Sequence, residues 1–87
     1  MTDKAQLKKA KSILKEIISI CYDIDFEELQ QEVASLERGF KDNLNSMAEA
    51  SDMISQIEMN INIFSDDIDT EEYLKIEELI TEFTEME

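Results

Sequence analysis

Apolar residues recur every three or four positions through the middle of the chain, which is the spacing of one face of an α-helix. Between residues 26 and 64 this pattern covers twelve successive positions, and only Asn43 interrupts it. The same positions would scatter over both faces of a β-strand, so the pattern predicts helices that pack against helices. The twelve positions, called the seam below, are Phe26, Leu29, Val33, Leu36, Phe40, Asn43, Met47, Ala50, Ile54, Ile57, Ile61 and Phe64.

Two shorter stripes flank the seam and predict helices over about residues 3–22 and 70–86, separated from it by turn-forming residues at 23–25 and 65–69. The chain has no Pro, a single Gly and no alternating strand pattern. We therefore expect an all-α protein with one helical domain over residues 1–87. The inward positions of the flanking helices are Leu7, Ala10, Leu14, Ile17, Cys21, Tyr73, Ile76, Ile80 and Phe83.

The seam allows two architectures. Its heptad register continues without a slip, which favours one long coiled-coil-like helix over residues 26–64, about 58 Å long at 1.5 Å per residue. Residues 42–46 are rich in turn-forming side chains, however, and Ser46 with Glu49 fits a capping box. A turn there would instead produce a four-helix bundle.

The small size of the chain suggests association. Ordering a residue costs about 1–2 kcal/mol of backbone entropy, and a buried Leu, Ile or Phe contributes about 1.5–3 kcal/mol, so a core built from 87 residues is marginal. A homo-oligomer or a complex with another chain is expected. A parallel in-register dimer would place Glu32 opposite Glu37 of the second chain, so an antiparallel or hairpin arrangement is favoured. Gly39 beside the seam either permits close approach of two backbones or is a tolerated defect costing about 1 kcal/mol.

Charge is distributed unevenly along the chain. The net charge is −14, with −2 on residues 1–45 and −12 on residues 46–87. Five lysines lie in the first predicted helix, and if that helix folds back on the seam, Lys11 and Lys15 come near Glu37 and Glu32. The second half has Lys75 as its only basic residue. Repulsion among its carboxylates opposes folding, so they serve either as a solvated face or as a surface for a basic partner.

The expected function is that of a non-enzymatic acidic interaction module. Carboxylates held on rigid helices can imitate a row of phosphates and compete for a basic, nucleic-acid-binding surface of a partner protein. In its small, acidic, helical character the chain resembles phage-encoded inhibitors that mimic DNA. It also resembles small structural subunits and assembly chaperones, and in that alternative another chain completes the seam. The partner-binding residues expected for the acidic face are Asp66, Asp67, Asp69, Glu71, Glu72, Glu77, Glu78 and Glu82.

Other function classes lack their usual residues. There is no His, no Gly-rich phosphate loop, and the one cysteine, Cys21, occupies an inward position, so neither catalysis, a metal nor a cofactor is expected. The acidic run at 66–71 lacks the spacing of a calcium loop. Direct nucleic-acid binding is not expected, because residues 1–16 carry +3 against −17 on residues 17–87. No apolar run is long enough to span a membrane or to act as a secretion signal, so a cytoplasmic location is expected.

Overall fold

The computed structural model describes residues 3–40 and 44–86, and every regular element within them is helical. The expectation of an all-α bundle is confirmed. The helices in chain order are α1 (Asp3–Asp23), α2 (Glu27–Phe40), α3 (Met47–Ile63), the short 3₁₀ helix η1 (Ser65–Asp67) and α4 (Thr70–Met86).

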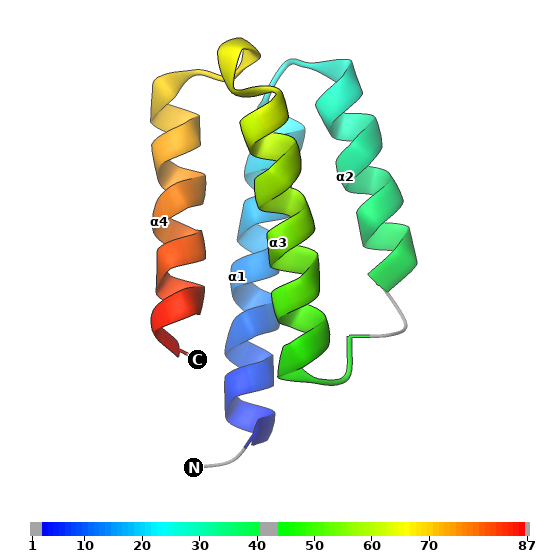
Figure 1. Ribbon diagram of the computed structural model, residues 1–87, viewed down its shortest axis with the longest axis vertical. Coiled ribbons are helices and arrows are strands. Elements are labelled where there is room, and N and C mark those ends of the chain that lie inside the picture. The colour runs from blue at the N-terminus through cyan, green and yellow to red at the C-terminus, as the bar shows by residue number, and fades with distance from the viewer. Residues whose placement is uncertain (1–2, 41–43, 87) are drawn as a thin grey trace.

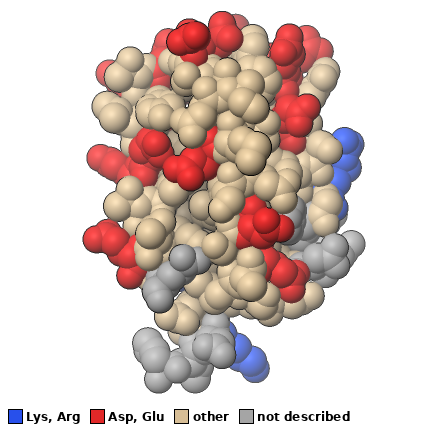
Figure 2. All heavy atoms as spheres, in the orientation of Figure 1, with Lys and Arg blue, Asp and Glu red and all other residues tan. Residues whose placement is uncertain are grey.

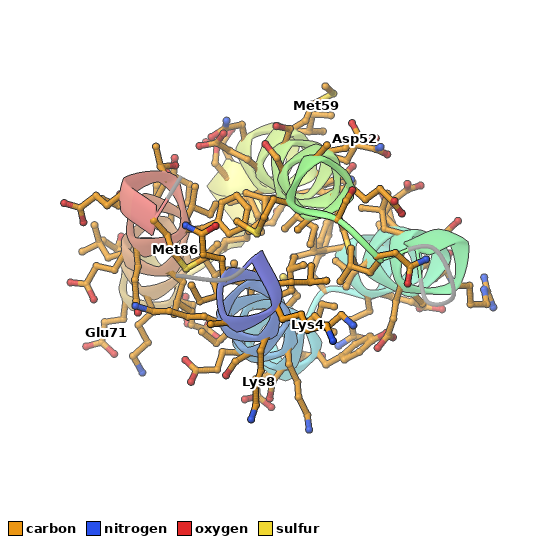
Figure 3. All side chains as sticks on the ribbon, turned by 90° about the horizontal axis from the view of Figure 1, so that it is seen from below. Lys4, Lys8, Asp52, Met59, Glu71 and Met86 are labelled. Carbon is orange, nitrogen blue, oxygen red and sulfur yellow. The ribbon has the colours of Figure 1, made fainter. Side chains whose placement is uncertain are left out.

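The four long helices run alternately up and down the bundle, so both chain ends lie at its lower end (Figure 1). Helices α1 and α3 occupy the middle, with α4 on one side of them and α2 on the other (Figures 1 and 3). Helix α1 packs against each of the other three helices. The bundle measures 39 × 24 × 17 Å.

The expectation of one continuous helix over residues 26–64 is wrong. Helix α2 ends at Phe40 and α3 begins at Met47, so the alternative four-helix arrangement is the one observed. The two ends of the seam meet, because the rings of Phe26 and Phe64 lie 5.1 Å apart in an edge-to-face arrangement at 64°. A single rod would leave its whole stripe in water, whereas the fold-back lets α2 and α3 bury each other's apolar faces.

Ser46 provides the start signal for α3. Its backbone is extended, and its hydroxyl oxygen accepts a hydrogen bond from the Glu49 N–H at 3.3 Å. The Ser46 hydroxyl also donates to Glu49 Oε1 at 3.2 Å, so the pair identified as a capping box does cap the helix, although the carboxylate bonds to the hydroxyl. Asp42 and Asn43, which belong to the expected turn, lie outside the described residues.

The turn between α1 and α2 is closed by a residue that the sequence pattern did not single out. The side-chain amide of Gln30 donates to the carbonyl oxygens of Tyr22 at 3.1 Å and Ile24 at 2.8 Å. The Tyr22 carbonyl lies in the last turn of α1 and the Ile24 carbonyl just beyond it, where the helix supplies no further N–H to carbonyl oxygens. Gln30 therefore holds the start of α2 against the end of α1.

The core draws apolar side chains from all four helices, and no polar or charged residue in the described part of the chain is buried with them. Among the seam residues, Leu29, Val33, Ala50, Ile54, Ile57 and Ile61 are buried. Partly buried seam residues packed against this core are Phe26, Leu36, Met47 and Phe64. The side chain of Phe40 lies outside the description. None of the described helices is long and apolar enough to cross a bilayer.

Gly39 does not mediate a close helix contact. A Cβ atom built at this position would meet no atom within 4 Å, and the residue does not have a positive φ. Of the two interpretations of Gly39, the close approach of backbones is therefore wrong.

Replacing Ser46 should change the free energy of unfolding in opposite directions in the four-helix bundle and in the continuous-helix architecture. In the observed bundle, Ser46→Ala removes the cap of α3 and should lower the free energy of unfolding by about 1 kcal/mol. In a continuous helix the same change would raise it, because Ala is the better helix former. Urea unfolding followed by circular dichroism measures the difference. The matched control is Ser55→Ala, at an exposed position inside α3, which should be neutral or slightly stabilising.

Replacing Gly39 should stabilise the protein. Gly39→Ala lowers the backbone entropy of the unfolded chain and meets no steric obstacle, so the free energy of unfolding should rise by about 0.5–1 kcal/mol. The same urea titration measures it. A loss of stability would contradict the open environment described for this residue.

Candidate interaction surface

Negative charge dominates the part of the bundle formed by α3, η1 and α4. Twelve carboxylates lie between residues 47 and 86, together with the single cation Lys75. In Figure 2, Asp and Glu side chains spread from the upper to the lower end of the visible face, while Lys and Arg appear only at one edge and at the bottom. In Figure 3, Lys8 of α1 projects from another side of the bundle. The uneven charge of the sequence thus becomes an uneven charge of the surface.

The structure places the eight expected acidic residues at one end of the bundle and along α4. Asp66 and Asp67 lie in η1, Asp69 immediately precedes α4, and the others lie within α4. Glu72 and Glu77 are half-buried, and the remaining six side chains are exposed, namely Asp66, Asp67, Asp69, Glu71, Glu78 and Glu82.

These eight residues do not share one face. Glu71, Glu78 and Glu82 are spaced by seven and four positions, which places them on the same side of α4. Glu72 approaches α1, because its charge acts on the buried thiol of Cys21. Glu77 lies on the opposite flank, toward α3. The acidic residues therefore wrap around α4, and Glu72 is the member least available to a partner.

One ion pair occurs among the described residues. Lys9 Nζ lies 3.9 Å from Glu82 Oε1, and both side chains are more than half exposed. An exposed pair at this distance contributes about 0.2–1 kcal/mol at most. Apart from Glu82, the described carboxylates of α3, η1 and α4 thus form no ion pair with a described cation.

Tyr73 joins α3 to α4 at the point where carboxylates from both helices converge. Its hydroxyl donates to Asn62 Oδ1 at 3.0 Å. The pKa of Tyr73 is raised, mainly by the charge of Glu77, and further by desolvation and by the charge of Glu58. Glu58 was not among the expected partner-binding residues, and the structure brings it into the same negative field. The sequence places Glu58 in the acidic second half of the chain, and the packing of α3 against α4 shows that it lies near Tyr73.

Exposed apolar side chains lie beside the acidic residues. Met59 and Ile63 are 62% and 65% exposed and lie one helical turn apart on α3, and Leu74 on α4 is 56% exposed. Met59 points away from the bundle in Figure 3, on the same side of α3 as Asp52. Met53 and Ile68, by contrast, are buried in the core. Leu74 was missed because it falls outside the inward stripe of its helix.

Cys21 is a packing residue. Its side chain is fully buried on α1, and burial, with a smaller contribution from the charge of Glu72, raises the pKa of its thiol to about 12. The thiolate, which is the reactive form, is therefore scarce at neutral pH. No group of three or more Cys, Asp or Glu side chains in residues 3–40 and 44–86 is arranged to hold a metal ion.

The fold and surface together define the class of protein: a small four-helix bundle with an acidic, partly apolar surface on α3, η1 and α4. Comparison with protein-family models, with curated proteins and with solved structures found no match. What the protein does must therefore be argued from this surface.

The thiol of Cys21 should resist modification in the folded protein. Because it is buried and its pKa is about 12, reaction with dithionitrobenzoate at about pH 8 should be slow in the native state and complete in urea. Release of the coloured thiolate measures both rates. Rapid stoichiometric reaction without urea would contradict the packing of α1 against the other helices.

Proposed function

We propose that this protein is a non-catalytic binding module whose acidic surface docks on a basic surface of another protein, of the kind that binds nucleic acid. The acidic surface is defined by the seven most available of the expected residues together with Glu58. It consists of Glu58, Asp66, Asp67, Asp69, Glu71, Glu77, Glu78 and Glu82.

The observation that carries this proposal is the density of charge along α4. Six glutamates lie between residues 71 and 85, an axial length of about 21 Å at 1.5 Å per residue. This is about one carboxylate per 3.5 Å, and Lys75 offsets one of the six. One strand of duplex DNA carries a phosphate about every 3.4 Å of helix axis. Counted along its axis, α4 thus carries carboxylates about as densely as a strand carries phosphates, and a groove lined with Lys and Arg would meet the subset on one side, Glu71, Glu78 and Glu82.

The rigidity of the surface supports the same role. The carboxylates of α4 project from a helix whose inner face is fixed by Ile76, Ile80 and Phe83 in the core. Little ordering is then required when a partner binds, which favours affinity. The exposed Met59, Ile63 and Leu74 offer apolar contact next to the charges, and such mixed surfaces are typical of protein interfaces.

The alternative of a structural subunit or assembly chaperone has less support. It was motivated by a seam that another chain would complete, and the described seam residues instead pack inside this chain. The same packing reduces the need for a homo-oligomer, which stays a prediction. The side chains of the acidic surface are mostly exposed and form one ion pair among the described residues, so this surface is the better basis for a function.

The test uses two triple variants with equal net charge. One neutralises the acidic surface (Asp67→Asn, Glu71→Gln, Glu78→Gln), and the other neutralises three exposed carboxylates elsewhere (Glu16→Gln, Glu27→Gln, Glu32→Gln). The tagged wild-type protein is used to capture partners from an extract of its native host, and each captured protein is then tested for duplex DNA binding with and without the bundle. Affinity for the captured partner should fall about tenfold in the first variant, since each exposed charge pair contributes about 0.2–1 kcal/mol.

The control variant should bind within about twofold of wild type, because a reduced net charge alone weakens steering only slightly at physiological salt. Wild-type binding should weaken steeply as salt is raised from about 50 to 200 mM, as it does for nucleic acid itself. Equal losses in the two variants would refute a localised docking surface. Partners that keep full DNA binding in the presence of the bundle would refute the nucleic-acid-competing role.

A further inference from the structure

A pocket of about 500 Å³ opens between α1, the end of α2 and the first half of α3. Its described apolar lining comes from α1, α3 and the segment before α3, and consists of Leu14, Ile18, Leu44 and Met53. This volume falls within the range of about 300–1,000 Å³ found for sites that bind small molecules.

Positive charge gathers at this pocket, in contrast with the rest of the protein. Lys11 and Lys15 lie one turn apart on α1, and Arg38 lies in the last turn of α2. They are three of the eight basic residues in a chain of net charge −14. All three side chains are exposed, and among the described residues none of them forms an ion pair.

The single described carboxylate in the lining, Glu37, offsets one of these three positive charges and leaves the rim with a net positive charge. Glu37 was expected near Lys11 and Lys15, and the structure does place all three around the same pocket. Its Oε1 atom, however, accepts a hydrogen bond from the Tyr22 hydroxyl at 2.9 Å. Glu37 is thereby held toward the end of α1, and the cations keep their hydrogen-bonding capacity for another anion.

We propose that this pocket binds a small amphiphile with one anionic headgroup. The headgroup contacts Lys11, Lys15 and Arg38 at the rim, and the apolar body lies against Leu14, Ile18 and Met53. Both parts are necessary for binding. The net negative charge of the protein repels a free anion at long range, so burial of the apolar body must contribute to the affinity. Arg38 adds a planar donor pair that suits a carboxylate or a phosphate.

This site is independent of the proposed docking function. The pocket lies between α1 and α2, whereas most of the acidic surface lies on η1 and α4, and α4 occupies the other side of the bundle (Figures 1 and 3). An experiment that refutes the pocket proposal therefore does not refute the docking proposal, and the reverse also holds.

The experiment titrates decanoate into the full-length protein and follows the methyl signals of Leu14, Ile18 and Met53 by NMR. Chemical-shift changes that saturate with decanoate concentration should be largest for these three methyl-bearing side chains. Acetate tests the headgroup alone, and decyltrimethylammonium tests the same tail with the opposite charge. At the concentration at which decanoate saturates the site, neither compound should change the chemical shifts of the pocket methyl groups. Decyl phosphate is compared with decanoate to show which headgroup is preferred.

Two double variants with equal net charge test the rim. Lys15→Gln with Arg38→Gln removes two cations from the pocket, and Lys9→Gln with Lys75→Gln removes two exposed cations elsewhere. The first should weaken decanoate binding at least about tenfold, and the second should change it by less than about twofold. Circular dichroism confirms that both remain folded. Absence of saturable shifts at the pocket methyls, shifts spread through the whole core, or equal losses in both variants would overturn the proposal.

Discussion

The contact of α2 with α3 is the interaction on which the rest of the structure depends. These helices carry the two halves of one continuous seam, and folding back brings its first and last residues, Phe26 and Phe64, together. Leu29 and Val33 then become buried in the same core as Ile57 and Ile61. An apolar stripe of this length cannot remain in water, so the chain either recruits a second copy or folds on itself. Folding on itself also sets the positions of α1 and α4.

Repulsion among the carboxylates opposes folding, and the free energy gained by burying apolar side chains exceeds this repulsion. No described charged residue is buried, and the one ion pair in the described part of the chain, Lys9 with Glu82, is exposed and weak. Stability must therefore come from apolar packing, and the carboxylates of α4 are held close together against their mutual repulsion. Along the axis of α4 these carboxylates are spaced about as closely as the phosphates of a nucleic-acid strand, although they wrap around the helix.

The candidate site was only partly predictable. Glu71, Glu78 and Glu82 could be assigned to one side of α4 from their spacing, because helix periodicity alone decides which residues share a face. The position of Glu72 against α1, of Glu77 and Glu58 beside Tyr73, and of the cationic pocket could not be assigned in this way. Each depends on which helix lies next to which, and the pattern within a single helix does not contain that information.

The sequence by itself determined that the protein is helical, which residues of each helix face inward, and where negative charge accumulates, because these properties depend on spacing along one chain segment. It also contained the cap at Ser46 that begins α3, but the unbroken register of the seam favoured the wrong architecture. Only the tertiary structure decided between the rod and the hairpin. Both satisfy the local helix pattern equally well, and they differ in whether the apolar stripe finds its partner within the same chain.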